Sequence, residues 1–228
     1  MAKCAHIYLP ETFADWETGF LAATLRSGEG LAEAPWQVRF VSENGKPVTS
    51  IGGLSANVDV AADQLAAADS DLLVLCGGES WNEGRHGPVL DVARRRIANG
   101  QPVAAICAAT VALARVGCLE TVDHTSNDLD FLKQLAPNYR GAACYRQQPV
   151  VRAGALVTAT GVAPIPFTAE TLLMVGAMTP MLAETWTDLM TTHEPAAFHR
   201  FMAAWQARAP AIAPDRSLER REPGLRLH

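Results

Sequence analysis

The chain has 228 residues, of which 49% are hydrophobic and 19% are charged, and its formal net charge is −5. This length and composition suit one folded domain with a sizeable core, and they exclude disorder over most of the chain. The acidic balance argues against a nucleic-acid-binding surface, because phosphate recognition needs clustered Lys and Arg. Two short basic runs do not supply one: residues 94–96 are expected on the polar side of a helix, and residues 216–226 are diluted by Glu219, Glu222 and Pro223.

The cysteines indicate reduced thiols. They form no CxxC pair and have no histidine at ligand spacing, which argues against both a disulfide framework and a zinc site; their positions are Cys4, Cys76, Cys107, Cys118 and Cys144. We therefore expect no metal, no cofactor and a cytoplasmic location. The first residues lack the basic stretch and long apolar run of a signal peptide, and no apolar run is long enough to span a bilayer, so we expect no membrane association.

Short apolar runs alternate with helical patterns along the chain, which predicts an α/β fold whose mostly parallel sheet is covered by helices. The expected strands are residues 4–9, 38–41, 72–76, 102–106 and a strand–turn–strand over 150–159. The segment over 44–60 begins with the turn signal Asn44-Gly45 and is expected to be a hairpin or strand excursion at the sheet edge. The expected helices are residues 15–26, 88–99, 108–116, 167–178, 181–190 and 196–207.

We expect one domain over residues 1–190. Residues 191–228 would add a C-terminal helix and a tail that pack on this domain or extend from it. The part from Pro210 onward is rich in Pro and Arg, which is typical of an arm or a disordered tail.

Cys107 stands where the buried strand at 102–106 gives way to a helix. Ligands bind at the carboxyl ends of parallel strands, and Gly77 and Gly78 end another strand at the same edge. At a helix N-terminus the sulfur would face free N–H groups and the positive end of the helix dipole, so we expect a lowered thiol pKa. The backbone N–H groups of Gly78 and Ala108 would then bind an oxyanion formed on the attacked atom.

The alternative is that Cys107 is a small core residue, as free cysteines often are. That interpretation suits Cys4 and Cys76 better, because both lie inside apolar strands. Cys107 follows a strand at a sharp elbow, and the small residues Ala108 and Ala109 leave little bulk over its sulfur. The elbow therefore favours a reactive thiol.

Several segments, taken together and in this order, resemble the ThiJ/PfpI family, also called the DJ-1 superfamily. They are ADWE at 14–17, Gly77-Gly78, AAIC at 104–107 with Leu113 and Gly117, HTSN at 124–127, and LVTATG at 156–161 with Phe167. Any one of these motifs alone would be weak. The resemblance implies a flavodoxin-like three-layer sandwich with helices on both faces of the sheet, and a homodimer.

The resemblance also implies site residues: Cys107 as the nucleophile and Glu17 as the acid that meets its sulfur. A protonated carboxyl can donate to a thiolate and an ionised one repels it, so we expect Glu17 to have a raised pKa. The alternative is a solvated residue in the first helical turn, a role that suits Asp15 better. Asn127 and Gly77 are expected to line the pocket. His124 is a candidate pocket residue and general base, with a structural role as the alternative.

The chain departs from the family at two points. The histidine that directly follows the cysteine in its proteases and glyoxalase-type members is Ala108 here, and the Gly-flanked cysteine and later His-x-Glu pair of glutaminases are missing. We expect Cys107 to attack a small carbonyl-like substrate in an amidase-, hydrolase-, glyoxalase- or hydratase-like reaction, with Glu17 shuttling the proton. The alternative is a redox or stress-response protein whose Cys107 is oxidised without turnover. A transcription-factor ligand-binding domain is disfavoured, because too few residues follow Met190 for a DNA-binding module.

Overall fold

The centre of the molecule, in a computed structural model that describes residues 2–207, is a seven-stranded sheet with the order β5–β2–β1–β6–β7–β9–β8. Its strands are β1 (Cys4–Tyr8), β2 (Gln37–Ser42), β5 (Val60–Ala61), β6 (Leu72–Leu75), β7 (Val103–Ile106), β8 (Val150–Ala153) and β9 (Leu156–Ala159). Neighbours pair in parallel except β8, which runs antiparallel to β9. The central strands β6 and β7 are buried at every residue, as a sheet covered on both faces requires.

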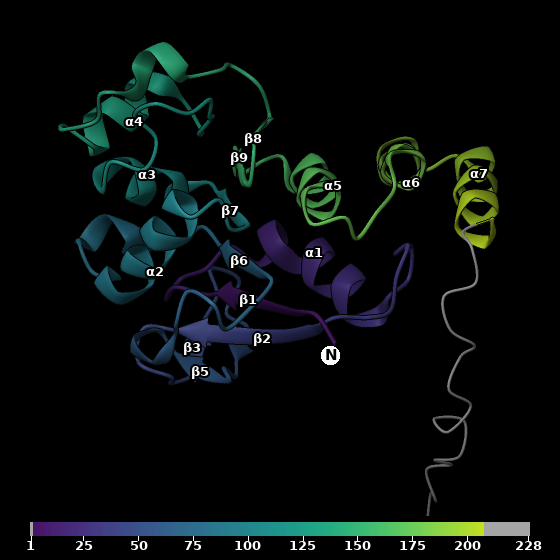
Figure 1. Ribbon diagram of the computed structural model, residues 1–228, viewed down its shortest axis with the longest axis horizontal. Helices are drawn as coiled ribbons and strands as arrows, with labels where there is room; N and C mark the ends of the chain where they lie inside the picture. Colours follow the sequence, from purple (N-terminus) through teal and green to yellow (C-terminus); the bar gives the residue numbers. More distant parts are fainter. Residues whose placement is uncertain (1, 208–228) are drawn as a thin grey trace, which may run out of the picture.

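Helices cover both faces of this sheet (Figure 1). They are α1 (Asp15–Ser27), α2 (Gly87–Ala98), α3 (Ala108–Arg115), α4 (Leu129–Leu135), α5 (Pro164–Met174), α6 (Pro180–Thr192) and α7 (Pro195–Gln206), with short 3-10 helices at Ala62–Gln64, Glu79–Glu83 and Gly141–Cys144. In Figure 1, α2, α3 and α4 lie on one side of the sheet, and α1 and α5 lie on the other. The predicted α/β sandwich is therefore confirmed.

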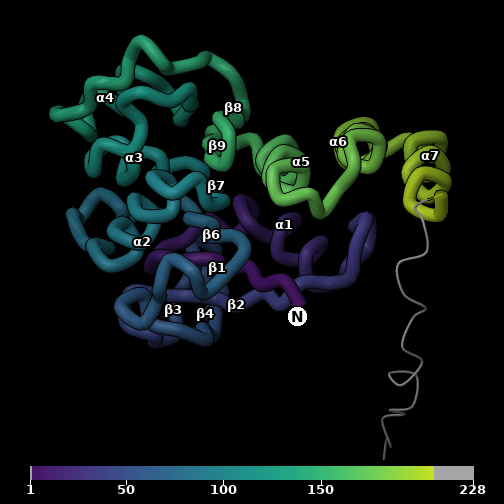
Figure 2. The backbone as a smooth tube through the Cα atoms, viewed as in Figure 1, coloured from purple at the N-terminus to yellow at the C-terminus, as the bar shows by residue number. Residues whose placement is uncertain are grey.

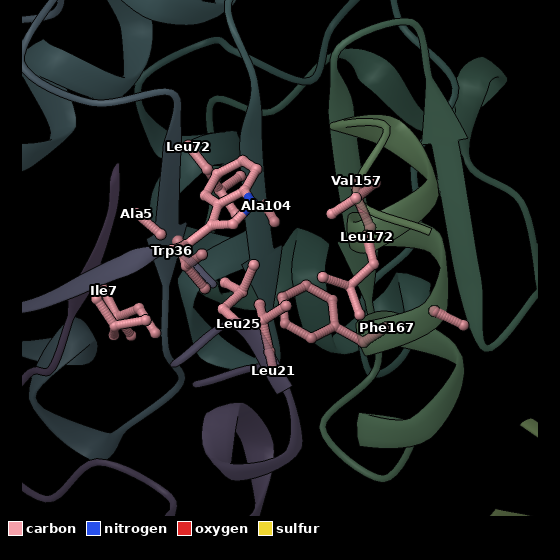
Figure 3. Packing of buried hydrophobic residues seen from close by; sticks show 14 of the residues in the cluster. Ala5, Ile7, Leu21, Leu25, Trp36, Leu72, Ala104, Val157, Phe167 and Leu172 are labelled. Carbon is pink, nitrogen blue, oxygen red and sulfur yellow. The ribbon is translucent and has the colours of Figure 1, made fainter. Parts of the chain in front are cut away.

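The core is divided into two layers by the sheet. Side chains alternate between the faces along each strand, so Ile7 of β1 packs toward α1 and α5, and its neighbour Tyr8 packs toward the α2 and α3 side. Figure 3 shows the first layer, in which Leu21 of α1 and Phe167 of α5 meet over the strands. Helices α1 and α5 also pack against each other over this face.

The segment over residues 44–60 divides into a ribbon and an edge strand. Strands β3 (Val48–Thr49) and β4 (Ser55–Ala56) form an antiparallel pair apart from the main sheet, and β5 then joins the sheet beside β2. The residues of the predicted Asn-Gly turn do form a turn, and Gly45 has φ 73°. The ribbon itself turns later, between Thr49 and Ser55, so both alternatives were partly right.

Two local features differ from the prediction. Helix α4 was not expected; the signal that marks its start is Asp128, whose side chain accepts a hydrogen bond from the backbone N–H of Phe131 at 2.9 Å. The run at 94–96 was placed on the polar side of a helix, but Arg96 is buried. Its guanidinium donates to backbone carbonyl oxygens, including that of Ala67 at 2.7 Å, and these bonds replace the water that the charge loses.

The last described helices continue outward from the sheet. Figure 2 shows the chain passing from α5 through α6 to α7, and α7 packs mainly against α6. The division predicted after residue 190 falls inside α6, and the segment predicted as a tail, from Pro210 onward, lies outside the described residues. Across residues 2–207, none of the helices combines the length and apolar character needed to cross a bilayer.

Candidate functional site

Cys107 occupies a sharp elbow between β7 and α3. Its backbone has φ 60° and ψ −130°, a conformation that residues with side chains rarely adopt. The backbone N–H of Cys107 donates to the carbonyl oxygen of Ala159 at 3.0 Å, which ties the elbow to β9. Its carbonyl oxygen accepts from both the backbone N–H of Thr110, at 3.0 Å, and the Thr110 hydroxyl, at 2.6 Å. These bonds hold the strained turn.

The hydroxyl groups of Thr110 and Ser126 support the backbone turn at Cys107. The buried Thr110 Oγ1 lies 2.6 Å from the Cys107 carbonyl oxygen and 2.7 Å from Ser126 Oγ. A carbonyl oxygen only accepts, so the Thr110 proton points to Cys107 and the Ser126 hydroxyl donates to Thr110. The segment around Ser126 is thereby joined to the backbone of the nucleophile.

Glu17 meets Cys107 in a space that only glycines leave open. The Glu17 side chain is fully buried on α1, and its Oε2 accepts from the backbone N–H of Gly77 at 2.6 Å. A Cβ at Gly161 would lie 2.7 Å from Cys107 Sγ and 3.0 Å from Glu17 Oε1, and a Cβ at Gly77 would lie 2.7 Å from Cys107 Cβ and 2.8 Å from Glu17 Oε1. The sulfur and the carboxyl oxygen thus face the same small volume.

Burial raises the pKa of the Glu17 carboxyl to about 7, although hydrogen bonds with Cys107 and Gly77 oppose the shift. Burial and the negative charge of Glu17 raise the pKa of the Cys107 thiol to about 11, and hydrogen bonds from Asn127 and the Ala108 N–H act in the opposite direction. The expected rise for Glu17 is found. The expected lowering for Cys107 is not, because loss of hydration beside a carboxylate outweighs the helix N-terminus. The Cys107 thiol therefore loses its proton more readily beside a protonated Glu17 than beside an ionised one.

Two more of the predicted residues contact the sulfur. Asn127 Nδ2 lies 3.3 Å from Cys107 Sγ, and the backbone N–H of Ala108 also hydrogen-bonds to the sulfur. Gly78 packs against the loop that follows β1, where an added Cβ would lie 3.0 Å from the carbonyl oxygen of Thr12. Ala108 is thus placed to donate at the site, and the oxyanion role of Gly78 stays a prediction.

His124 is bound within its own loop. Its side chain is fully buried, with Nδ1 2.7 Å from the Val122 carbonyl oxygen and Nε2 2.5 Å from the Tyr139 hydroxyl. The carbonyl oxygen requires a proton on Nδ1, which leaves Nε2 to accept from Tyr139. Burial also lowers the His124 pKa. Both ring nitrogens are therefore occupied, which favours the structural interpretation over a general base.

Three further residues, Gly161, Trp16 and Cys76, lie at the site although no site role was predicted for them. Gly161 follows β9 at the same sheet edge as Cys107, and its carbonyl oxygen accepts from Trp16 Nε1 at 2.8 Å. Cys76 Sγ lies 3.9 Å from Glu17 Oε2. The signal available for Gly161 was its place at the end of LVTATG, just beyond a predicted strand. Trp16 is part of ADWE but was given no role, and nothing in the sequence linked Cys76 to Cys107. In the described part of the chain, no cluster of three His, Cys, Asp or Glu side chains is arranged to hold a metal.

Sequence comparison finds similar proteins in Bacillus subtilis. The chain is 37% identical over 199 residues to YoaZ, an uncharacterized protease of Bacillus subtilis, covering 86% of this chain and 95% of that protein. A second uncharacterized protease of that bacterium, YdeA, is 35% identical over 178 residues, covering 78% and 86%.

Solved structures show the same fold. A ThiJ/PfpI family protein from Bacillus anthracis superposes with a TM-score of 0.85 at 39% identity, covering 90% of this chain and 97% of that one. A DJ-1 superfamily protein from Agrobacterium tumefaciens gives 0.74 at 37% identity, covering 84% and 100%. The sequence model of the DJ-1/PfpI family matches residues 3–174, the whole region that builds the sheet and the Cys107 site. The chain therefore belongs to the DJ-1/PfpI family.

Proposed function

We propose that this protein uses Cys107 to attack a small carbonyl-like electrophile, with Glu17 as the proton shuttle. The observation that carries the proposal is the buried Glu17 carboxyl. Its Oε2 is bound by the Gly77 N–H, and its Oε1 borders the Cys107 sulfur and has no conventional hydrogen-bond donor among residues 2–207. A carboxyl with a pKa of about 7 both accepts and returns a proton near neutral pH.

The proposed first step needs no co-reactant. The Cys107 thiol proton passes to Glu17 as the sulfur bonds to the carbonyl carbon, and the electron pair of the carbonyl π bond moves to the oxygen. Glu17 then returns the proton to that oxygen. Ala108 follows Cys107 directly, so the Cys–His dyad of a peptidase is missing, and we favour amidase-, glyoxalase- or hydratase-like chemistry on small molecules over peptide hydrolysis.

A redox or stress-response function is the second candidate. The side-chain amide of Asn127 and the backbone N–H of Ala108 both donate to the sulfur, and the same donors would bind oxygen atoms added to it. In that case peroxide would convert Cys107 to the sulfenic and then the sulfinic acid, with reduction of the peroxide, and no substrate would turn over.

Mass measurement of the intact protein and of its peptides separates the two functions. Wild type, Cys107→Ser and a control, Cys118→Ser, are treated separately with small aldehydes, with isocyanides and with mild peroxide. We expect a carbonyl adduct on Cys107 that the control retains and Cys107→Ser loses, with turnover of at least one compound. Oxidation of Cys107 without any adduct or turnover would support the sensor instead. Modification of Cys118 or Cys144 ahead of Cys107 would contradict both.

We further propose a cytoplasmic homodimer without nucleic-acid or membrane partners. Exposed apolar side chains near the site support the dimer: Trp16 is 50% exposed, and Val162, which follows Gly161, is 87% exposed. A monomer at micromolar concentration in light scattering would contradict it.

A further inference from the structure

We propose that Asn127 is a second catalytic residue, which binds the oxygen that becomes negatively charged when Cys107 attacks, and that Thr160 positions it. The inference rests on the proposed function of Cys107 and narrows its substrates to carbonyl compounds. It stands on three observations: the fixed orientation of the Asn127 amide, the anchoring of its loop, and the exposure of its side chain.

The orientation of the Asn127 amide is set by its neighbours. Asn127 Oδ1 lies 2.8 Å from the backbone nitrogen of Gly161 and 3.2 Å from Thr160 Oγ1. The Gly161 N–H can only donate, so it requires an oxygen opposite it, and a flipped amide would set two donors against each other. The NH₂ group must then be the end that points at Cys107 Sγ, at 3.3 Å.

The loop that carries Asn127 is anchored at two further points. The backbone N–H of Thr125 donates to Thr158 Oγ1 on β9 at 2.9 Å, and Ser126 Oγ bonds to Thr110 Oγ1 on α3 at 2.7 Å. Thr125 and Ser126 are both buried. The amide is therefore held between β9 and α3, and such fixed donors stabilise developing charge without reorganising.

The amide has a donor left over for a ligand. The Asn127 NH₂ carries two hydrogens, one directed at the sulfur, and the residue is exposed to solvent. A carbonyl carbon bonded to Cys107 places its oxygen within reach of this second N–H. An amide neither accepts nor releases a proton in this step, so Asn127 acts electrostatically and leaves proton transfer to Glu17. Attack on an isocyanide creates no oxyanion, which is why the geometry favours carbonyl compounds.

The test compares two reactions of Cys107, only one of which forms an oxyanion. Wild type, Asn127→Ala, Asn127→Asp and a control at an exposed asparagine, Asn138→Ala, are reacted with iodoacetamide and with methylglyoxal, a small aldehyde. Rates are followed by mass measurement across the pH range, so that a change in thiolate fraction is seen in the iodoacetamide profile. We expect loss of the donor to slow aldehyde addition by about 100-fold beyond any change in alkylation. The control should match wild type in both reactions.

Thr160 is tested by removing and restoring its hydroxyl. Thr160→Val removes one of the two donors to Asn127 Oδ1 and leaves the Gly161 N–H in place. The amide is then held less firmly, and we expect aldehyde addition to slow by about tenfold. Thr160→Ser should restore the rate.

Three outcomes have different meanings. If aldehyde addition and alkylation fall by the same factor in both Asn127 variants, Asn127 stabilises only the thiolate and the inference is wrong while Cys107 remains the nucleophile. If wild type alkylates at Cys107 but no aldehyde adds to it, the carbonyl substrate class and the proposed function both fail. If Thr160→Val equals wild type, the positioning role of Thr160 is refuted.

Discussion

The buried Glu17 carboxyl predicts a specific pH dependence of stability. Its pKa rises from an ordinary 4.5 to about 7 on folding. Below pH 4.5 the group is protonated in both states and contributes no difference. Between pH 4.5 and pH 7 the unfolded chain releases the proton and the folded protein keeps it, so the free energy of unfolding falls as pH rises. Above pH 7 the carboxyl is ionised in both states, and the loss of stability is constant. At 1.36 kcal/mol per pKa unit the loss is about 3 kcal/mol.

Glu17→Gln should remove this loss. The side-chain oxygen of the introduced glutamine can still accept from the Gly77 N–H, but the side chain cannot ionise. We expect the variant to match wild type near pH 4 and to exceed it by about 3 kcal/mol at pH 8, equivalent to a Tm higher by about 6 to 12 °C for a chain of this size. Urea unfolding at several pH values measures the difference. Glu29→Gln, at an exposed acid, serves as the control. A stability difference between Glu17→Gln and wild type that stays the same from pH 4 to pH 8 would refute the raised pKa of Glu17.

Other substitutions test the rest of the site and the core. Gly161→Ala should destabilise by about 1–3 kcal/mol and slow alkylation of Cys107, because the new methyl would lie 2.7 Å from the sulfur; normal alkylation would show that the loop yields freely. Thr110→Val should cost about 1–3 kcal/mol in urea unfolding through the lost bond to the Cys107 carbonyl, and Thr110→Ser should recover most of it. Burial lowers the pKa of His6 below its ordinary 6.5, so on acidification the unfolded chain takes up the proton before the folded protein does, and stability falls. His6→Leu should therefore lose less stability than wild type between pH 7 and 5 in urea unfolding, and an equal loss would contradict this.

The predicted elements were most accurate where the sequence pattern is local. The apolar runs of β6 and β7 lie on strands that are buried at every residue, and Gly28 ends α1 with φ 74°, as a helix-terminating glycine does. Helix α4 was missed because it is short and largely exposed, so it has little apolar periodicity. Arg96 was misplaced because its burial depends on carbonyl oxygens far away along the chain.

By itself the sequence determined the fold class, the elbow at Cys107 and, through the family resemblance, the partnership with Glu17. Only the tertiary structure decided the electrostatics. The pKa of Cys107 rises instead of falling because the sulfur is buried and because α1 brings the Glu17 carboxylate beside it from a distant part of the sequence; no local pattern predicts either effect. The same holds for Asn127, whose amide orientation depends on Thr160 and Gly161 on a separate strand end. The local pattern of apolar residues predicts helices and strands, whereas pKa shifts and side-chain hydrogen bonds depend on which residues from distant parts of the sequence come into contact.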